Sequence, residues 1–224
     1  MNSLFLLHGA IGASDQLKPL QLHFPGSQLF DFPGHGGTSF PETFSIPVFA
    51  AAVLRRMDEQ QIAKADFFGY SMGGYVALYL ARHSPDRVGK IVTLATKFAW
   101  DEATAQKEVK MLDPQKIAEK VPKFAAALEK RHAPNDWQVV LQHTAEMMLS
   151  LGKEPALKEE DFRQIQHPVF ITVGDRDTMV SLEETIAVYR ALPNAQFAVL
   201  PGTPHPIEQV SPEKISVVAG WLMC

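Results

Sequence analysis

The chain has 224 residues, of which 46% are hydrophobic and 21% are charged, which is typical of a globular protein and favours a single domain. A net charge of -4 gives no basic surface for nucleic acid, and no apolar run approaches the roughly 20 residues that span a bilayer. The only cysteine is Cys224, which fits a reducing, cytoplasmic compartment, and the eight histidines show no zinc-site spacing. We therefore expect no metal, nucleic-acid or membrane partner.

Short apolar runs alternate with helical patterns along most of the chain. The runs predict six strands, at residues 4–7, 27–32, 65–70, 88–95, 168–173 and 195–200. Between and after them, amphipathic spacing predicts helices near 15–18 and over 46–61, 72–83, 182–192 and 213–222. This alternation predicts an α/β fold with a doubly wound, mainly parallel sheet.

The pattern changes between residues 98 and 162, where no strand-like run occurs. Helical segments over 102–112, 114–131 and 135–151 are separated by breaks that contain proline or glycine. Because strands resume directly afterwards, we expect a helical lid insertion, residues 98–162, within one domain of residues 1–224.

A glycine-serine-glycine motif lies between the strand that ends at Tyr70 and the helix that begins at Met72. Gly69 and Gly73 flank Ser71, as in the sharp turn that raises a nucleophilic serine above a sheet. Side chains at either glycine would collide across such a turn. The alternative is a glycine-rich turn in which Ser71 only caps the helix.

Two further polar groups follow later strands. Asp175 and Asp177 come after Gly174, and His205 follows the last predicted strand. Carboxyl ends of parallel strands are where such sheets place their sites, and serine, acid, histidine is the chain order of an α/β-hydrolase triad. His205 could alternatively be an ordinary surface-loop histidine between two prolines.

Together these motifs resemble the α/β-hydrolase superfamily. The likeness rests on His8-Gly9, the glycine-rich loop 31–36, Gly69 to Gly74, Gly174 to Asp177 and His205, and so extends over nearly the whole chain. The family domain usually begins with two more strands before His8-Gly9. The sheet should therefore be short at one edge, which a second copy of the chain in a homodimer could cover.

The resemblance implies a role for each site residue. Ser71 would be the nucleophile and His205 its base. The family places the acid three residues after the glycine, which selects Asp177 and leaves Asp175 as a loop residue. The backbone N–H groups of Ala10 and Met72 would form the oxyanion hole, whereas the His8 side chain would brace that loop.

An apolar substrate pocket is expected between the lid and the sheet. The residues that we expect to line it are Tyr70, Phe98, Trp100, Trp137 and Met148. Aromatic and methionine residues at helical spacing are more often core, so this set is the least constrained by the sequence.

The function implied is a serine hydrolase that cleaves an ester or thioester of a small, apolar substrate through an acyl-enzyme, without a cofactor. A carbon–carbon bond hydrolase or lyase and a perhydrolase share the same triad and remain alternatives. So does a non-catalytic ligand receptor on this fold.

Overall fold

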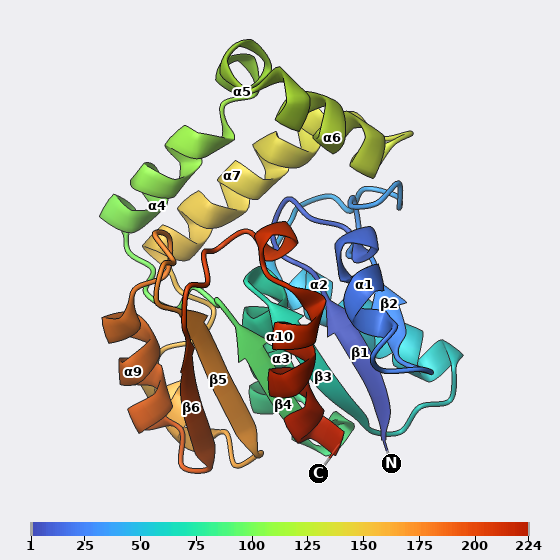
Figure 1. Ribbon diagram of the computed structural model, residues 1–224, viewed down its shortest axis with the longest axis vertical. Coiled ribbons are helices and arrows are strands. Elements are labelled where there is room, and N and C mark those ends of the chain that lie inside the picture. Colours follow the sequence, from blue (N-terminus) through green and yellow to red (C-terminus); the bar gives the residue numbers. More distant parts are fainter. Residues whose placement is uncertain (1, 224) are drawn as a thin grey trace.

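A computed structural model describes residues 2–223, within which six parallel strands form one sheet. Their order across the sheet is β2-β1-β3-β4-β5-β6 (Figure 1). The strands are β1 (Ser3–Leu7), β2 (Gln28–Phe30), β3 (Ala65–Tyr70), β4 (Val88–Leu94), β5 (Val169–Gly174) and β6 (Ala195–Leu200). The predicted doubly wound parallel sheet is confirmed, with each strand within a few residues of its expected bounds.

Helices cover both faces of this sheet, because alternate strand residues point to opposite sides. In β1, Phe5 joins the core beneath α2 (Ile46–Glu59), α3 (Met72–His83) and α9 (Leu182–Ala191). Leu6 points to the other face, where α1 (Lys18–Gln21) and α10 (Pro212–Ala219) pack. Short 3-10 turns at Ser14–Leu17 and Gly220–Met223 extend α1 and α10.

Strand β2 is shorter than predicted because the backbone after Phe30 bonds to loops instead of to β1. The Phe32 amide donates to Nε2 of His8 at 3.2 Å, and the Phe32 carbonyl accepts from the Thr38 hydroxyl at 2.9 Å. The glycine-rich segment that follows thus folds back onto the end of β1.

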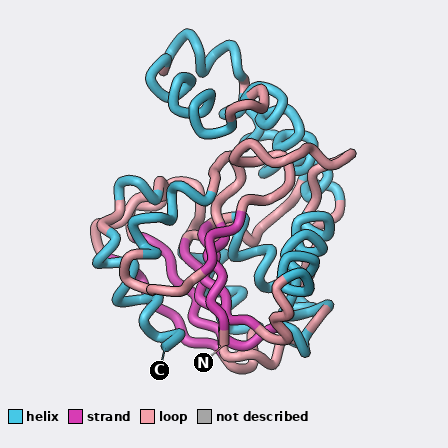
Figure 2. The backbone as a smooth tube through the Cα atoms, turned by 90° about the vertical axis from the view of Figure 1, so that its right-hand side faces the viewer, coloured by secondary structure: helices cyan, strands magenta, loops and turns pink. Residues whose placement is uncertain are grey.

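Within the helical insertion, residues 98–162, the helices over 102–153 lie above the carboxyl ends of the strands (Figure 1). In Figure 2 its outer helices stand clear of the sheet. The predicted helix 114–131 is split at Pro122, which lacks an N–H and begins a new helix. The helices are α4 (Glu102–Val109), α5 (Pro114–Lys120), α6 (Pro122–His132), α7 (Trp137–Lys153) and α8 (Glu159–Gln164), with a 3-10 turn at Lys110–Leu112.

The helical insertion is joined to the sheet through its last two helices. Helix α7 contributes Met147 and Leu151 to the core beneath it. Helix α8, which the sequence analysis missed, contributes Asp161, which accepts from Arg82 of α3 at 2.9 Å.

The turn at Ser71 is the tightest part of the fold. Ser71 has φ 52° and ψ -117°, a left-handed conformation that costs a non-glycine residue free energy. A Cβ on Gly73 would lie 2.3 Å from the Leu7 carbonyl oxygen, and one on Gly69 would lie 2.4 Å from the backbone of Gly74. The turn therefore needs glycine at both flanks because backbone passes directly against backbone.

We predict that Gly73→Ala lowers the free energy of unfolding by about 1–3 kcal/mol, the usual cost of forcing atoms into a packed interior. Urea denaturation followed by circular dichroism measures it. Gly220→Ala is the control, since a Cβ there has nothing within 4 Å and the backbone of Gly220 is right-handed helical. This substitution should leave stability unchanged or raise it by up to about 1 kcal/mol. Equal stability of the two variants would contradict the close contact.

Candidate functional site

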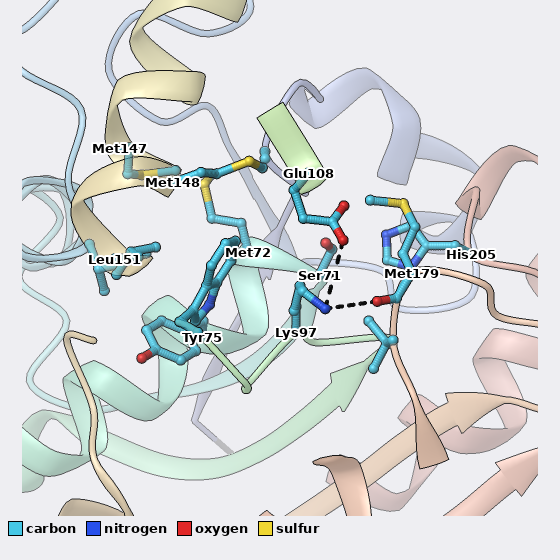
Figure 3. A pocket seen from close by; sticks show the side chains of 14 residues that line it. Ser71, Met72, Tyr75, Lys97, Glu108, Met147, Met148, Leu151, Met179 and His205 are labelled. Carbon is cyan, nitrogen blue, oxygen red and sulfur yellow. Dashed lines mark hydrogen bonds and ion pairs between the residues drawn. The ribbon is translucent and has the colours of Figure 1, made fainter. Parts of the chain in front are cut away.

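The carboxyl ends of four strands bring the expected site residues to one place. Ser71 follows β3, Asp177 follows β5 and His205 follows β6, while Ala10 lies in the loop after β1. Ala10, Ser71 and His205 line one cavity (Figure 3). Residues separated by more than 100 positions in the sequence thus meet at the carboxyl end of the sheet, where parallel sheets place their sites.

His205 is oriented by Asp177. Its Nδ1 donates to Oδ2 of Asp177 at 2.8 Å, and the side chains are 10% and 0% exposed. The other oxygen, Oδ1, accepts from the backbone N–H groups of Met179 and Val180, each at 2.8 Å. The carboxylate is therefore fixed by three donors, and Nε2 of His205 is left as the proton acceptor.

The neighbouring acid, Asp175, points elsewhere. Its Oδ1 accepts from the Thr203 amide at 3.2 Å, so it ties the loop after β5 to the loop that carries His205. The geometry thus supports the choice of Asp177 over Asp175 as the partner of His205.

The backbone of Ser71 is held on three sides. Its N–H donates to the Leu94 carbonyl at 2.8 Å. Its own carbonyl accepts from the Thr96 hydroxyl at 3.0 Å and from the Gly74 amide at 3.1 Å. These bonds offset the strained conformation and leave the Ser71 side chain facing the cavity (Figure 3).

The cavity over Ser71 has a volume of about 40 Å³. Most of its wall is apolar and comes from α3 and α7, through Met72, Tyr75, Met147, Met148 and Leu151. Lys97 and Glu108 also reach it, as Figure 3 shows. A small apolar group therefore fits beside Ser71, next to two charged side chains.

Of the five residues predicted to line the pocket, Trp100 and Met148 do so. Tyr70, Phe98 and Trp137 do not line this cavity. The Tyr70 hydroxyl donates to the His205 carbonyl at 3.0 Å, and burial raises its pKa. Phe98 packs edge-on against Phe162. Trp137 packs in a separate core between α5, α6 and α7.

The Gly9 peptide is oriented so that the Ala10 amide can serve as a donor. The Gly9 carbonyl accepts from Nδ1 of His8 at 2.7 Å and from the Gly12 amide at 3.0 Å. Because a trans peptide directs its C=O and N–H oppositely, these bonds turn the Ala10 N–H away from His8. Both Ala10 and Met72 line the cavity, as a two-amide oxyanion hole requires.

Three buried histidines hold three successive carbonyls of this loop. Nδ1 of His8 bonds to the Gly9 carbonyl at 2.7 Å, and Nε2 of His35 bonds to the Ala10 carbonyl at 2.6 Å. Nε2 of His132, in α6, bonds to the Ile11 carbonyl at 3.2 Å. Burial lowers the pKa of each ring, to about 4 for His132. The expected bracing role of His8 is thus shared with two other histidines, one of them in the helical insertion.

Arg131, beside His132, extends this contact. It donates to the Ile11 carbonyl at 3.3 Å and to Glu208 at 2.9 Å. Glu208 lies three residues after His205, so the end of α6 touches both the loop after β1 and the segment that carries the histidine.

The described residues 2–223 contain no group of three or more histidine, cysteine, aspartate or glutamate residues placed to hold a metal ion. No helix in that range is long and apolar enough to cross a membrane.

Comparison with known proteins places these features among hydrolases. The alpha/beta hydrolase fold family matches residues 2–144. The chain is 29% identical over 231 residues to a pimeloyl-[acyl-carrier protein] methyl ester esterase of Neisseria meningitidis serogroup C, which covers 92% of this chain and 87% of that protein. The protein of that name from Yersinia enterocolitica is 28% identical over 243 residues, covering 95% and 90%.

Among solved structures, a thermophilic esterase from Thermogutta terrifontis superposes with a TM-score of 0.77. The superposition covers 100% of this chain and 90% of the esterase chain, at 22% sequence identity. At that identity the likeness concerns the fold.

The buried histidines predict an acid-sensitive fold. In the folded chain His132 stays neutral down to pH about 4, whereas a histidine of the unfolded chain binds a proton below its ordinary pKa of 6.5. The unfolded state therefore binds more protons between these values, and the free energy of unfolding falls as the pH drops from 6.5 towards 4. His132 alone contributes on the order of 3 kcal/mol to this loss.

We predict that the free energy of unfolding falls less steeply with acid in His132→Gln. The glutamine amide can replace the hydrogen bonds of His132 to the Ile11 carbonyl and from the Gly36 amide, but it does not titrate. Urea denaturation at a series of pH values between 4 and 7 measures the slope. The exposed His23, changed to Gln, is the control and should retain the wild-type slope. An unchanged slope in His132→Gln would refute the assignment.

Proposed function

Because the chain belongs to the alpha/beta hydrolase family and is an ester-cleaving serine hydrolase, we propose that it acts through an acyl-enzyme on Ser71. The substrate is a small, mainly apolar ester or thioester. The observation that carries the proposal is the 2.8 Å bond from His205 to Asp177 beside a serine on a strained turn.

In this mechanism the Ser71 hydroxyl attacks the ester carbonyl while Nε2 of His205 accepts its proton. Asp177 keeps the proton-accepting nitrogen directed at the cavity and stabilises the imidazolium that forms. The amides of Ala10 and Met72 donate to the negative oxygen of the tetrahedral intermediate. His205 then protonates the leaving alcohol, and water, activated by the same histidine, releases the acid and restores Ser71.

The substrate class rests on the cavity. A volume of about 40 Å³ with methionine and aromatic walls suits a short acyl or alcohol group. The relatives from Neisseria and Yersinia are named for a methyl ester of a pimeloyl group on acyl-carrier protein, so a small alcohol such as methanol is a suitable leaving group for this chain too.

The helical insertion acts as a lid in this proposal. Three side chains of α7, Met147, Met148 and Leu151, line the cavity, so movement of α7 would change the room beside Ser71. A cytoplasmic location and a homodimer remain predictions from the sequence.

We expect a fluorophosphonate probe to label Ser71, and the protein to hydrolyse p-nitrophenyl acetate and butyrate. Ser71→Ala should abolish labelling and lower kcat by a factor of about 10⁴ or more. Mass spectrometry of the labelled peptide and release of p-nitrophenol measure these outcomes. A wild-type protein that neither labels nor exceeds the alanine variant in turnover would favour a ligand receptor instead.

Replacing each of the two loop acids by asparagine, in separate variants, distinguishes their roles. Asp177→Asn should lower kcat by about 10³–10⁴, because His205 then loses its charged orienting partner. Asp175→Asn is the matched control on the same loop and should change kcat by less than about tenfold, with a loss of stability. Steady-state kinetics on p-nitrophenyl butyrate measures both, and a reversed order would make Asp175 the acid.

A further inference from the structure

Two charged side chains enter the otherwise apolar cavity over Ser71. Lys97 comes from the loop after β4, and Glu108 comes from α4 of the helical insertion. Figure 3 shows both beside Ser71. The ester-hydrolysis mechanism described above uses neither, so their presence calls for another explanation.

Lys97 has one close partner. Its Nζ donates to the Met179 carbonyl at 2.9 Å and lies 3.6 Å from Glu184 and 3.9 Å from Glu108. Glu184 already accepts from the backbone amides of Phe98 at 2.9 Å and Ala99 at 3.3 Å. Lys97 therefore keeps donor capacity towards the cavity, whereas Glu184 serves the loop.

Glu108 lacks a partner at hydrogen-bond distance. Only 6% of the residue is exposed, yet within residues 2–223 its carboxylate accepts no hydrogen bond, and its nearest cation is Lys97 at 3.9 Å. The Glu108 oxygens reach the open space of the cavity, and a carboxylate in mainly apolar surroundings without a donor is disfavoured. Its position on the cavity wall means that a molecule in the cavity can supply that donor.

We propose that Glu108 and Lys97 select substrates that carry a hydroxyl group near the scissile ester. The hydroxyl donates to Glu108 and accepts from Lys97. Two atoms 3.9 Å apart can both lie about 2.8 Å from one oxygen, the usual O–H···O distance. This inference rests on the proposed ester hydrolysis and specifies its substrate.

The charges favour a neutral hydroxyl over a carboxylate. One lysine faces two glutamates, Glu108 and Glu184, so the cluster is formally one charge negative and repels an anionic substrate. An alkyl group in the same place would leave Glu108 without a donor, and a site built for a hydroxyl discriminates against the analogue that lacks it.

Paired esters test the proposal. The first pairs place the hydroxyl in the acyl part: methyl 2-hydroxybutanoate against methyl 2-methylbutanoate, and methyl 3-hydroxybutanoate against methyl 3-methylbutanoate. The last pair places it in the alcohol: 2-hydroxyethyl butanoate against propyl butanoate. Acid release in a pH-stat gives kcat/KM, and we expect the hydroxyl ester to be preferred at least tenfold in one pair or more.

Glu108→Leu should bring that preference ratio close to one, and Glu108→Gln should reduce it part of the way, because an amide oxygen is a weaker acceptor than a carboxylate. Glu102→Gln, an exposed glutamate of the same helix, is the control and should leave the ratio unchanged. A purely structural role for Glu108 would lower both esters of a pair equally. If circular dichroism shows that Glu108→Leu is unfolded, Glu108→Gln decides.

The outcomes separate this inference from the function on which it rests. Ser71-dependent hydrolysis without preference in any pair overturns the hydroxyl proposal and leaves the esterase intact. A preference that persists in the Glu108 variants also overturns it. Absence of Ser71-dependent hydrolysis of every ester overturns both.

Discussion

The candidate site depends on the close packing of the turn at Ser71 against the end of β1. A Cβ on Gly73 would lie 2.3 Å from the Leu7 oxygen and 2.8 Å from that of His8. The loop that carries Ala10 begins immediately afterwards. The strand end, the strained serine and the first turn of α3 therefore pack as one unit. In the proposed mechanism, this packing fixes the spacing between Ser71 and the amides of Ala10 and Met72 before any substrate binds.

The cavity joins two environments that favour different parts of a substrate. Methionine and aromatic side chains from α3 and α7 bind apolar groups without directional demands. Lys97 and Glu108, in contrast, would bind polar groups in a defined direction. Charges in apolar surroundings interact strongly with a correctly placed polar group and disfavour a misplaced one. Binding strength would then come mainly from the apolar wall, and discrimination from the two charged groups.

The sequence predicted the strands of the sheet well, because each is a short apolar run bounded by turn residues, which is a local signal. It predicted the lining of the cavity poorly. Helical spacing shows which residues share a face of a helix but not which way that face turns, so Trp137 was expected in the cavity while Glu108 was not considered. Helix α8 was missed because it is six residues long, with a single buried apolar side chain, Phe162. The role of His132 depends on its contact with Ile11 in the loop after β1, 121 residues earlier, for which the sequence holds no local signal.

Helix α6 bears on how far the insertion is a replaceable module. His132 and Arg131 bind the Ile11 carbonyl, and Asn135 donates to the Gly34 and Thr38 carbonyls at 3.2 Å and 2.7 Å. A chimaera that exchanged the whole insertion to alter selectivity would also remove supports of the loop after β1. Grafts confined to α4 and α5 would keep these contacts intact, so the boundary between helices that can be exchanged and helices that support the loop after β1 runs through the insertion itself.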